Sequence, residues 1–175
     1  RKTMLDLLKD AGRDVIAVGK IFDIFDGEGV TEKIKTTGNT NGIAFTKALQ
    51  TRDFEGLAFV NLVDFDMLYG HRRDVAGYAA AATEFDKFVA DFIPGMREGD
   101  ILMVTADHGC DPSYTKTTDH TREYVPYLIC GKGVKPGVDL GTKLCFGTIA
   151  HTICDYLGVD ASTLDGQSVL SDILA

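Results

Sequence analysis

The sequence predicts an α/β fold with a mostly parallel central sheet flanked by helices. Three observations support this prediction. A helical pattern at residues 2–11 is followed at once by a short apolar strand at residues 14–18, and this alternation is typical of α/β folds. Residues 56–62 form a nearly continuous apolar run, as is usual for a strand buried on both faces of a parallel sheet. A long amphipathic segment at residues 75–92 then leads to another apolar strand at residues 101–104.

The first half of the chain contains clear start and stop signals between these elements. Gly12 is well placed to end the first helix. Residues 21–37 contain several glycines and are predicted to form a long functional loop with at most a turn of helix. A second helix is predicted at residues 41–52, with Thr40 as its N-cap.

In the second half, the helix predicted at residues 75–92 ends at Pro94 and Gly95. Its apolar residues are expected to lie on one stripe that faces the core. This stripe consists of Val75, Tyr78, Ala79, Ala82, Phe85, Val89 and Phe92. The remaining predicted elements are a strand at residues 125–130 and helices at residues 148–157 and 169–174.

Composition excludes several classes of function. The 175 residues are 45% apolar and 25% charged, which is ordinary for a globular domain. The net charge of −8 and the absence of a basic stripe argue against a nucleic-acid partner. No apolar run approaches the length of a membrane span. The four cysteines have neither CxxC spacing nor the density of a disulfide scaffold, so a reduced cytoplasmic setting is expected.

Two loops that follow predicted strands carry most of the chemically active side chains. Carboxylate and imidazole groups are the ligands of catalytic divalent metals such as Zn²⁺ or Mn²⁺. Parallel strands open their C-terminal ends at one edge of a sheet, so the two loops are expected to face each other. The loop after Leu62 contributes Asp64, Asp66 and His71, and the loop after Val104 contributes Asp107, His108 and His120.

Some residues near these loops have simpler explanations. Aspartates after strands often cap a helix or close a turn, and we expect this of Asp64 and Asp111 rather than of Asp66. His151 is expected to be a hydrogen-bonded structural residue of a helix. Three arginines could hold a phosphate, although pairing with nearby carboxylates is the stronger expectation: Arg72, Arg73 and Arg122.

Two longer motifs resemble a known family. Residues 59–74, FVNLVDFDMLYGHRRD, and residues 105–126, TADHGCDPSYTKTTDHTREYVP, are similar to the two C-terminal metal-binding segments of the phosphopentomutases. These enzymes belong to the alkaline phosphatase superfamily. The resemblance covers the whole chain, including GKIFDIFDGEGVT at residues 19–31. The DFDxxYGHRRD and TDHTREYVP segments are specific to the family, whereas ADHG marks only the superfamily.

The resemblance implies an alkaline-phosphatase-like core with two divalent metals, usually Mn²⁺. It also implies an isomerase of nucleotide salvage that exchanges a phosphate between the C1 and C5 oxygens of ribose or deoxyribose. Lys20 corresponds to a lysine that contacts the phosphate of the substrate. Asp119, Arg122 and Glu123 are candidates to orient His120. The implied ligands are Asp66, His71 and His120 for one metal, and Asp107 and His108 for the other.

The chain also departs from the family pattern. Family members carry a nucleophilic threonine, a further aspartate ligand and a cap domain, which are expected upstream of this segment. Residues 1–175 are therefore expected to be the C-terminal portion of a metal-dependent phosphomutase core domain. This segment contains no nucleophile and is expected to be inactive alone. The alternatives are another phosphomutase or phosphatase of the superfamily, or a non-catalytic metal-binding domain.

Overall fold

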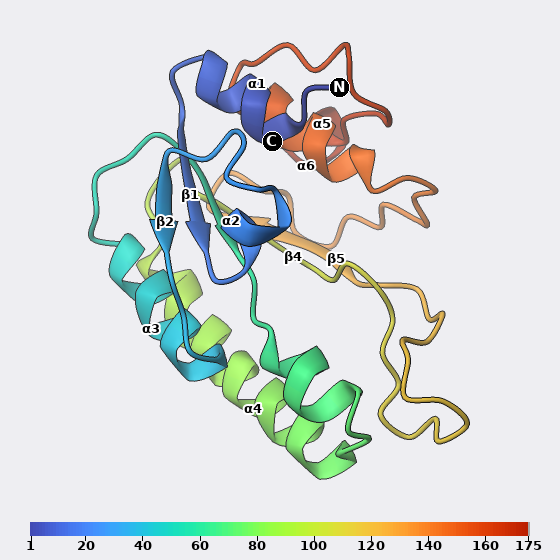
Figure 1. Ribbon diagram of the computed structural model, residues 1–175. Helices are drawn as coiled ribbons and strands as arrows, with labels where there is room; N and C mark the ends of the chain where they lie inside the picture. Colours follow the sequence, from blue (N-terminus) through green and yellow to red (C-terminus); the bar gives the residue numbers. More distant parts are fainter. Residues whose placement is uncertain (175) are drawn as a thin grey trace. The chain divides into compact units, whose positions relative to one another are not determined.

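The computed structural model describes residues 1–174, which form two compact units (Figure 1). The first unit is built from three separate stretches of the chain, and the second from two. The first comprises residues 1–35, residues 52–61 and the segment from residue 133 onward; the second comprises residues 36–51 and 62–132.

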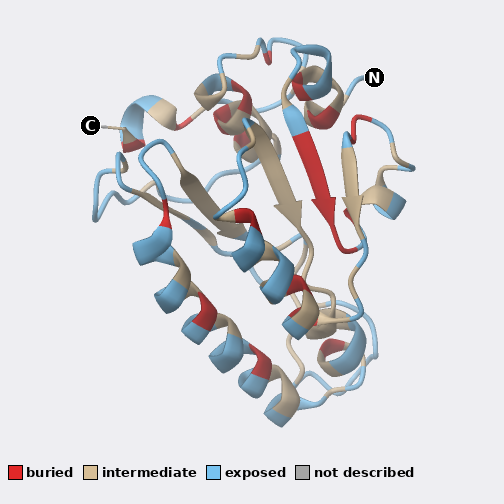
Figure 2. Cartoon of the chain, turned by 90° about the vertical axis from the view of Figure 1, so that its left-hand side faces the viewer, coloured by how far each residue is buried: buried red, intermediate tan, exposed pale blue. Residues whose placement is uncertain are grey.

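The first unit contains a parallel sheet of three strands in the order β2-β1-β3 (Figure 1). The strands are β1 (Asp14–Val18), β2 (Glu32–Ile34) and β3 (Gly56–Val60). Residues 15–18 of the central strand β1 are buried, and Figure 2 shows it as a red strand between two tan ones. The predicted parallel sheet is therefore confirmed.

The prediction for residues 21–37 was incomplete, because this segment contains both β2 and the short helix α2 (Ile21–Ile24). Three residues of sequence Glu-Lys-Ile are too few to show a strand pattern by alternation. The strand exists because its backbone pairs with β1, with Ala17 opposite Lys33.

Three helices complete the first unit: α1 (Met4–Asp10), α5 (Gly147–Tyr156) and α6 (Leu170–Ile173). The core of this unit joins α1 to the sheet and to α5. Leu5 and Leu8 of α1 are fully buried and lie in one cluster with Val15, Ala17 and Cys154. The predicted helices at residues 2–11 and 169–174 are confirmed with shorter bounds, and the one at residues 148–157 is confirmed with a shift of one residue. Gly12 and Gly158, past the ends of α1 and α5, have the positive φ angles of 76° and 69° that suit glycine.

Helix α1 begins with a capping box, and this feature makes stability depend on pH. The Asp6 carboxylate accepts a hydrogen bond from the Thr3 backbone N–H at 2.7 Å, and the Asp6 N–H donates to the Thr3 hydroxyl. The backbone bond from Thr3 holds the pKa of Asp6 below its usual value. This carboxylate therefore contributes stability above the pKa it has in the unfolded chain, and the contribution is lost as pH falls through the lower pKa of the folded state.

Replacing Asp6 with Asn is expected to lower the free energy of unfolding by about 0.5–1 kcal/mol at pH 7, because asparagine can still accept the Thr3 hydrogen bond but lacks the negative charge that favours a helix N-terminus. The difference from the unmodified protein should shrink toward zero as the pH approaches about 2, because both side chains are then neutral. Urea unfolding at several pH values measures this. The exposed Asp86 provides the control, and Asp86→Asn should change stability by less than about 0.5 kcal/mol. A loss from Asp6→Asn that is equal at pH 7 and pH 2 would contradict the capping interpretation.

The second unit contains two long helices and an antiparallel pair of strands. Figure 1 shows α3 and α4 side by side. The elements are α3 (Asn39–Leu49), a π-helical segment η1 (Phe65–Gly70), α4 (Val75–Phe92), a 3-10 turn η2 (Ile93–Gly95), β4 (Ile101–Thr105) and β5 (Tyr127–Gly131).

The predicted start of the helix at residues 41–52 is wrong. Helix α3 begins at Asn39, and its N-cap residue is Gly38 rather than Thr40. The Thr40 hydroxyl donates to Glu84 Oε1 instead, at 2.8 Å. The first turn is fixed from a distance in sequence, because the backbone N–H of Asn39 donates to the carboxylate of Asp64 at 2.7 Å. A cap of this kind leaves no local pattern from which it can be predicted.

The predicted bounds of α4 are confirmed, but its buried stripe is different. Ala81 and Phe88 are the buried residues of this helix, whereas Val75 is 52% exposed. Ala79 and Ala82 are also exposed. The inner face instead follows the 3-and-4 spacing of Tyr78, Ala81, Phe85, Phe88 and Phe92, with ring contacts from Phe85 to Phe88 and from Phe88 to Phe92. Alanines are poor markers of a helix face, because they are common on both sides.

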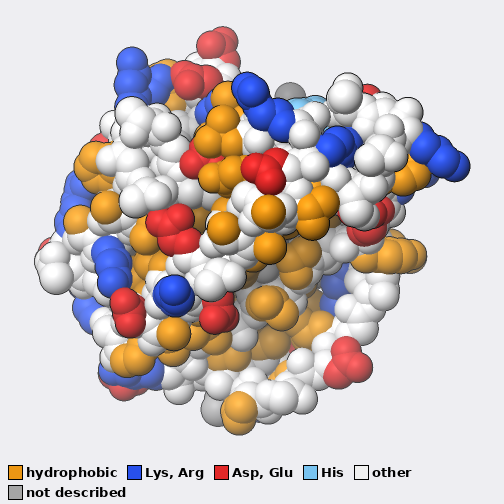
Figure 3. Space-filling model, turned by 90° about the horizontal axis from the view of Figure 1, so that it is seen from below, with side chains coloured by type: hydrophobic (Ala, Val, Ile, Leu, Met, Phe, Trp, Pro, Cys, Tyr) orange, Lys and Arg blue, Asp and Glu red, His pale blue; other side chains and the backbone are white. Residues whose placement is uncertain are grey.

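Strands β4 and β5 pair antiparallel, and β4 is not hydrogen-bonded to β3. The two loops of the predicted site are therefore not brought together as neighbouring strand ends of one parallel sheet. Both loops belong to the second unit, which is where their side chains meet. In one face of the molecule, shown in Figure 3, hydrophobic side chains gather between scattered acidic and basic ones. Within residues 1–174, no helix has the length and apolar character needed to cross a membrane.

Candidate metal centre

Asp66 lies on the π-helical segment η1 and is the central residue of the site. A π-helix is rare and is found mostly at functional positions, since its wider turn places side chains in unusual directions. The chain begins this turn at Asp64, which exchanges two hydrogen bonds with Asn39: Asn39 N–H to Asp64 Oδ2 at 2.7 Å, and Asp64 N–H to Asn39 Oδ1 at 3.0 Å. This pair anchors the start of the segment that presents Asp66.

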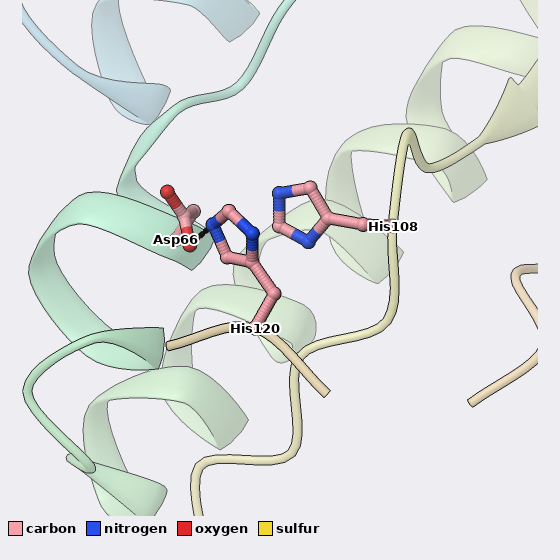
Figure 4. A group of neighbouring side chains, drawn as sticks. All are labelled: Asp66, His108 and His120. Atoms are coloured by element: carbon pink, nitrogen blue, oxygen red, sulfur yellow. Dashed lines mark ion pairs between the residues drawn. The ribbon is translucent and has the colours of Figure 1, made fainter. Parts of the chain in front are cut away.

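Asp66, His108 and His120 form a compact group (Figure 4), in which one ligand atom from each residue lies within 4.8 Å of the others. His120 Nε2 is 3.5 Å from Asp66 Oδ1, the ion pair drawn as a dashed line. The rings of His108 and His120 stack, with centroids 3.7 Å apart and planes inclined by 22°. The residues are 42 and 54 positions apart from Asp66 in sequence, so the fold alone brings them together.

His71 adds a third imidazole beside Asp66. Its Nε2 atom is 3.3 Å from Asp66 Oδ2, and its ring centroid is 4.9 Å from that of His120. Its other nitrogen, Nδ1, is 2.5 Å from the carbonyl oxygen of Thr118. A carbonyl can only accept, so Nδ1 carries a proton, which leaves Nε2 as the nitrogen that could bind a metal beside Asp66. Metal-ligating histidines are commonly oriented in this way.

One carboxylate oxygen of Asp66 lacks a hydrogen-bond partner in the part of the chain that the structure describes. Among residues 1–174, Asp66 Oδ1 is the buried side-chain oxygen or nitrogen without a hydrogen-bond partner. The His120 nitrogen at 3.5 Å is too distant to replace one. A buried carboxylate oxygen without a partner is costly, unless a cation binds it. The donor set of one carboxylate and three imidazoles therefore fits a divalent metal.

Asp107 and Lys20 are not members of this three-residue group. Asp107 follows β4 directly, and its side chain is 79% exposed, with Oδ1 3.7 Å from His108 Nε2. The geometry thus places His108 with Asp66 and His120, and leaves Asp107 at the outer side of His108. Lys20 is the N-cap residue of α2 and belongs to the first unit. The assignment of ligands to two separate metals stays a prediction.

The loop that carries His120 has its own internal contacts. Asp119 Oδ1 accepts from the backbone N–H of His120 at 2.8 Å and lies 3.6 Å from His120 Nδ1, so this aspartate does contact His120 as expected. Glu123 instead accepts from the Thr121 hydroxyl at 2.5 Å. Gly109 allows this close packing, because a Cβ at that position would lie 2.7 Å from the backbone nitrogen of Glu123.

The simpler explanations hold for several polar residues. Asp64 anchors Asn39, and Asp74 caps α4 by accepting from the Gly77 N–H at 2.9 Å. Asp111 accepts from the hydroxyl and the backbone N–H of Ser113, and these bonds lower the pKa of Asp111. His151 Nε2 is 3.2 Å from the carbonyl oxygen of Leu164, which agrees with a structural role.

Arg73 was misjudged from sequence. Its guanidinium does not pair with a carboxylate but donates to the backbone carbonyl oxygens of Asp111, Thr117 and Asp119. The motif contains four charged or ionisable residues in a row, His-Arg-Arg-Asp, and a carboxylate partner was the natural expectation. Contacts to main-chain carbonyls have no sequence signature, so no pattern could have revealed them.

Cys110 and Tyr78 lie on the apolar side of the centre. Burial raises the pKa of the Cys110 thiol, and the nearby Asp66 carboxylate raises it further. Burial likewise raises the pKa of Tyr78. A Cβ on Gly70 would collide with Cys110 Sγ, so glycine is needed for η1 to approach this loop. The Cys110 thiol and the Tyr78 hydroxyl therefore keep their protons near neutral pH, so neither adds a negative charge beside Asp66.

A cavity of about 200 Å³ opens beside the histidines. Its lining includes Tyr78, His108, Cys110, Glu123 and Pro126. His108 is shared between this cavity and the candidate metal group, so a molecule bound in the cavity would be next to the metal ligands.

Comparisons with known proteins agree with a metal centre. A family model described as "Metalloenzyme superfamily" matches residues 8–161. The chain is 52% identical over 173 residues to a phosphopentomutase of Acetivibrio thermocellus, and 52% identical over 174 residues to one of Lachnoclostridium phytofermentans. It is 49% identical to a phosphopentomutase of Alkaliphilus metalliredigens. In each case the alignment covers 99% of this chain and 44% of the relative. The chain thus spans less than half the length of these curated relatives.

Proposed function

Because this chain belongs to the Metalloenzyme superfamily, we propose that it forms part of the catalytic core of a phosphopentomutase. Such an enzyme is an isomerase that moves a phosphate between the C1 and C5 oxygens of ribose or deoxyribose. The observation that carries the proposal is the buried, unpartnered oxygen of Asp66 among three imidazoles. Identities near 50% to three phosphopentomutases over nearly the whole chain support the choice of substrate class.

The proposed ligands of one metal are Asp66, His71 and His120, and those of a second are Asp107 and His108. We propose Mn²⁺ as the metal. Bound divalent cations neutralise the negative charge of a transferring phosphoryl group and polarise its oxygens. His108 stacks on His120, a proposed ligand of the other metal, with ring centroids 3.7 Å apart.

The protein side chains contribute orientation and charge. The Thr118 carbonyl fixes His71 in the tautomer that offers Nε2, and Asp119 holds the backbone of His120. Lys20, on the loop after β1, is proposed to hold the phosphate at the far end of the sugar, since an ammonium group is a mobile point charge suited to phosphate. The cavity beside His108 is proposed to receive part of the substrate.

The remaining parts of the reaction are proposed to come from a segment outside residues 1–175. These parts are the nucleophilic threonine, one further aspartate ligand and the cap that encloses the sugar. The coverage of 44% of the relatives supports this proposal. On this proposal, residues 1–175 alone are inactive.

The setting is proposed to be the cytoplasm, with a role in nucleotide salvage. The cysteines fit a reducing compartment, because Cys110, Cys130, Cys145 and Cys154 are all free in the part of the chain that the structure describes.

An assay of the complete protein tests the proposed activity. With Mn²⁺ present, the complete protein should convert ribose 1-phosphate and deoxyribose 1-phosphate to the 5-phosphates. The conversion is monitored by ³¹P NMR. Phosphoglycerates and a generic phosphate ester serve as competing substrates. Conversion of phosphoglycerates alone would indicate a different phosphomutase, and release of free phosphate would indicate a phosphatase. Metal binding without turnover of any substrate would favour a non-catalytic metal-binding protein.

A further inference from the structure

Arg73 occupies an unusual position directly after the segment that carries Asp66 and His71. Its backbone has a φ angle of 57°, which is uncommon for a residue other than glycine. The turn is held by Arg73 N–H to the Gly70 carbonyl at 3.1 Å and by Asp74 N–H to the Tyr69 carbonyl at 2.9 Å. The protein maintains this conformation at the cost of local strain, which makes a specific role for the side chain worth seeking.

The guanidinium of Arg73 is bonded to a loop some forty residues away. Nε donates to the Thr117 carbonyl at 2.9 Å, and Nη1 donates to the Asp111 carbonyl at 3.1 Å. Nη2 donates to the Asp119 carbonyl at 2.5 Å and also contacts the Thr117 carbonyl. Since His71 Nδ1 bonds the Thr118 carbonyl, three consecutive carbonyls, at residues 117, 118 and 119, are held by two neighbouring side chains.

This loop is held by hydrogen bonds rather than by regular secondary structure. Residues 111–120 contain no helix or strand, and residues 113–120 are all exposed. Its base is closed by one isolated bridge, in which the Thr121 N–H donates to the Gly109 carbonyl at 3.1 Å. Local hydrogen bonds add to this, since the Ser113 N–H donates to Asp111 and the Asp119 N–H donates to the Thr117 hydroxyl. The carbonyl contacts of Arg73 and His71 tie residues 117–119 to the segment that carries Asp66.

The position of His120 follows directly from these contacts. The Asp119 carbonyl bonded by Arg73 belongs to the peptide that joins Asp119 to His120. Fixing that peptide plane fixes the Cα of His120, and from there its ring lies with Nε2 3.5 Å from Asp66 Oδ1. Arginine suits this task because its planar fork presents five donors in fixed directions, whereas lysine offers a single ammonium on a flexible stem.

We propose that Arg73 is a positioning residue, which folds the loop of residues 111–120 by binding its carbonyl oxygens and thereby places His120 beside Asp66. Arg73 touches neither metal nor substrate in this role. The inference rests on the metal centre of the proposed function, but it concerns how that centre is assembled.

The test compares Arg73→Ala with Arg72→Ala in the complete protein. Arg72 is a matched control, because it is adjacent to Arg73, has the same charge and is exposed. Its guanidinium donates a long hydrogen bond of 3.4 Å to the Met67 carbonyl. Mn²⁺ affinity is measured by titration, using the EPR signal of the free ion. Arg73→Ala should weaken Mn²⁺ binding about ten- to a hundredfold, and Arg72→Ala should leave it within about twofold. Equal affinities in the two variants would overturn the proposal.

A second readout is independent of metal. Lys116 lies in the middle of the loop and is exposed, so trypsin can cut after it once the loop opens locally. In Arg73→Ala, the fragment that begins at Thr117 should appear about tenfold faster than in Arg72→Ala, in the presence of a chelator. Unchanged cleavage would overturn the proposal. If the complete protein itself does not bind Mn²⁺, the proposed function fails, and this cleavage rate still decides the role of Arg73.

Arg73→Lys covers the case in which Arg73→Ala does not fold. It keeps the positive charge and the aliphatic stem but cannot reach three carbonyls at once. The Mn²⁺ affinity of Arg73→Lys should be lower than that of the unmodified protein. Its cleavage after Lys116 should be faster than in the unmodified protein but slower than in a protein whose loop is disordered. A Lys variant with unaltered affinity and unaltered cleavage would show that charge alone suffices, and would overturn the proposed positioning role.

Discussion

Replacing Asp66 with Asn is expected to abolish metal binding and catalysis while leaving the fold intact. We expect Mn²⁺ affinity to fall at least about a hundredfold, and turnover in the complete protein to fall about a thousandfold or more. A thousandfold loss corresponds to about 4 kcal/mol of transition-state stabilisation, which is within the contribution expected of a catalytic metal.

The physical reason is the chemistry of the Asp66 side chain. It contributes the negative charge of the three-residue group and has a buried oxygen without a hydrogen-bond partner in residues 1–174. An amide has nearly the same shape, but it carries no charge and is therefore a weaker ligand for a divalent cation than a carboxylate. In the metal-free protein, the amide also removes the negative charge of a carboxylate whose buried Oδ1 atom has no hydrogen-bond partner in residues 1–174. Asp66→Asn should therefore be at least as stable as the unmodified protein when metal is absent.

Thermal unfolding with and without Mn²⁺ separates these effects. At a free Mn²⁺ concentration about a hundred times the dissociation constant, binding stabilises the unmodified protein by about 2.7 kcal/mol, and this shift should be missing in Asp66→Asn. Asp74→Asn is the matched control from the same motif, because Asp74 caps α4 and is not a proposed ligand. It should change the free energy of unfolding by less than about 0.5 kcal/mol, because asparagine is about as good an N-cap as aspartate, and it should retain the full metal-induced shift. A normal shift in Asp66→Asn would refute the ligand assignment.

Replacing Leu8 with Ala is expected to cause the largest loss of stability. Leu8 is 0% exposed and belongs to the core cluster of the first unit, together with Leu5, Val15 and Cys154. Removing a buried leucine side chain costs its transfer free energy and leaves a cavity, which together amount to about 3 kcal/mol. For a domain of this size, such a loss lowers the unfolding temperature by roughly 6–12 °C.

Leu144→Ala is the control with identical chemistry. Leu144 is 97% exposed, so its truncation should change the free energy of unfolding by less than about 0.5 kcal/mol. Urea unfolding monitored by circular dichroism gives both values. Similar losses from Leu8→Ala and Leu144→Ala would mean that α1 does not pack against the sheet as described.

The elements predicted from sequence are those whose signals are local. Apolar runs in the sequence predict the strands β1 and β3. The long amphipathic segment with Pro94 at its end predicts α4. The short strand β2 was missed, because its three residues become a strand only by pairing with β1. The start of α3 was misplaced for a similar reason, since Asp64 binds its first turn from 25 residues away.

The candidate metal centre divides in the same way. The sequence alone determined which side chains can bind a metal. The DFDxxYGHRRD and TDHTREYVP motifs identify Asp66, His71 and His120 by their residue types and spacing. It also indicated that these residues follow strands. The separation into ligands and structural residues was partly readable, since aspartates that cap helices or turns, such as Asp64 and Asp111, follow general rules.

Only the tertiary structure decided how these side chains meet. His108 lies within reach of both Asp107 and the pair of Asp66 and His120, because η1 and the loop after β4 pack in one unit. The role of Arg73 was invisible in the sequence, because its partners are main-chain carbonyls, which every residue possesses alike. Local signals specify elements and residue types, whereas contacts between residues forty or more positions apart depend on how the whole chain packs. Within residues 1–174, the buried Asp66 Oδ1 atom lacks a hydrogen-bond partner only once that packing is complete.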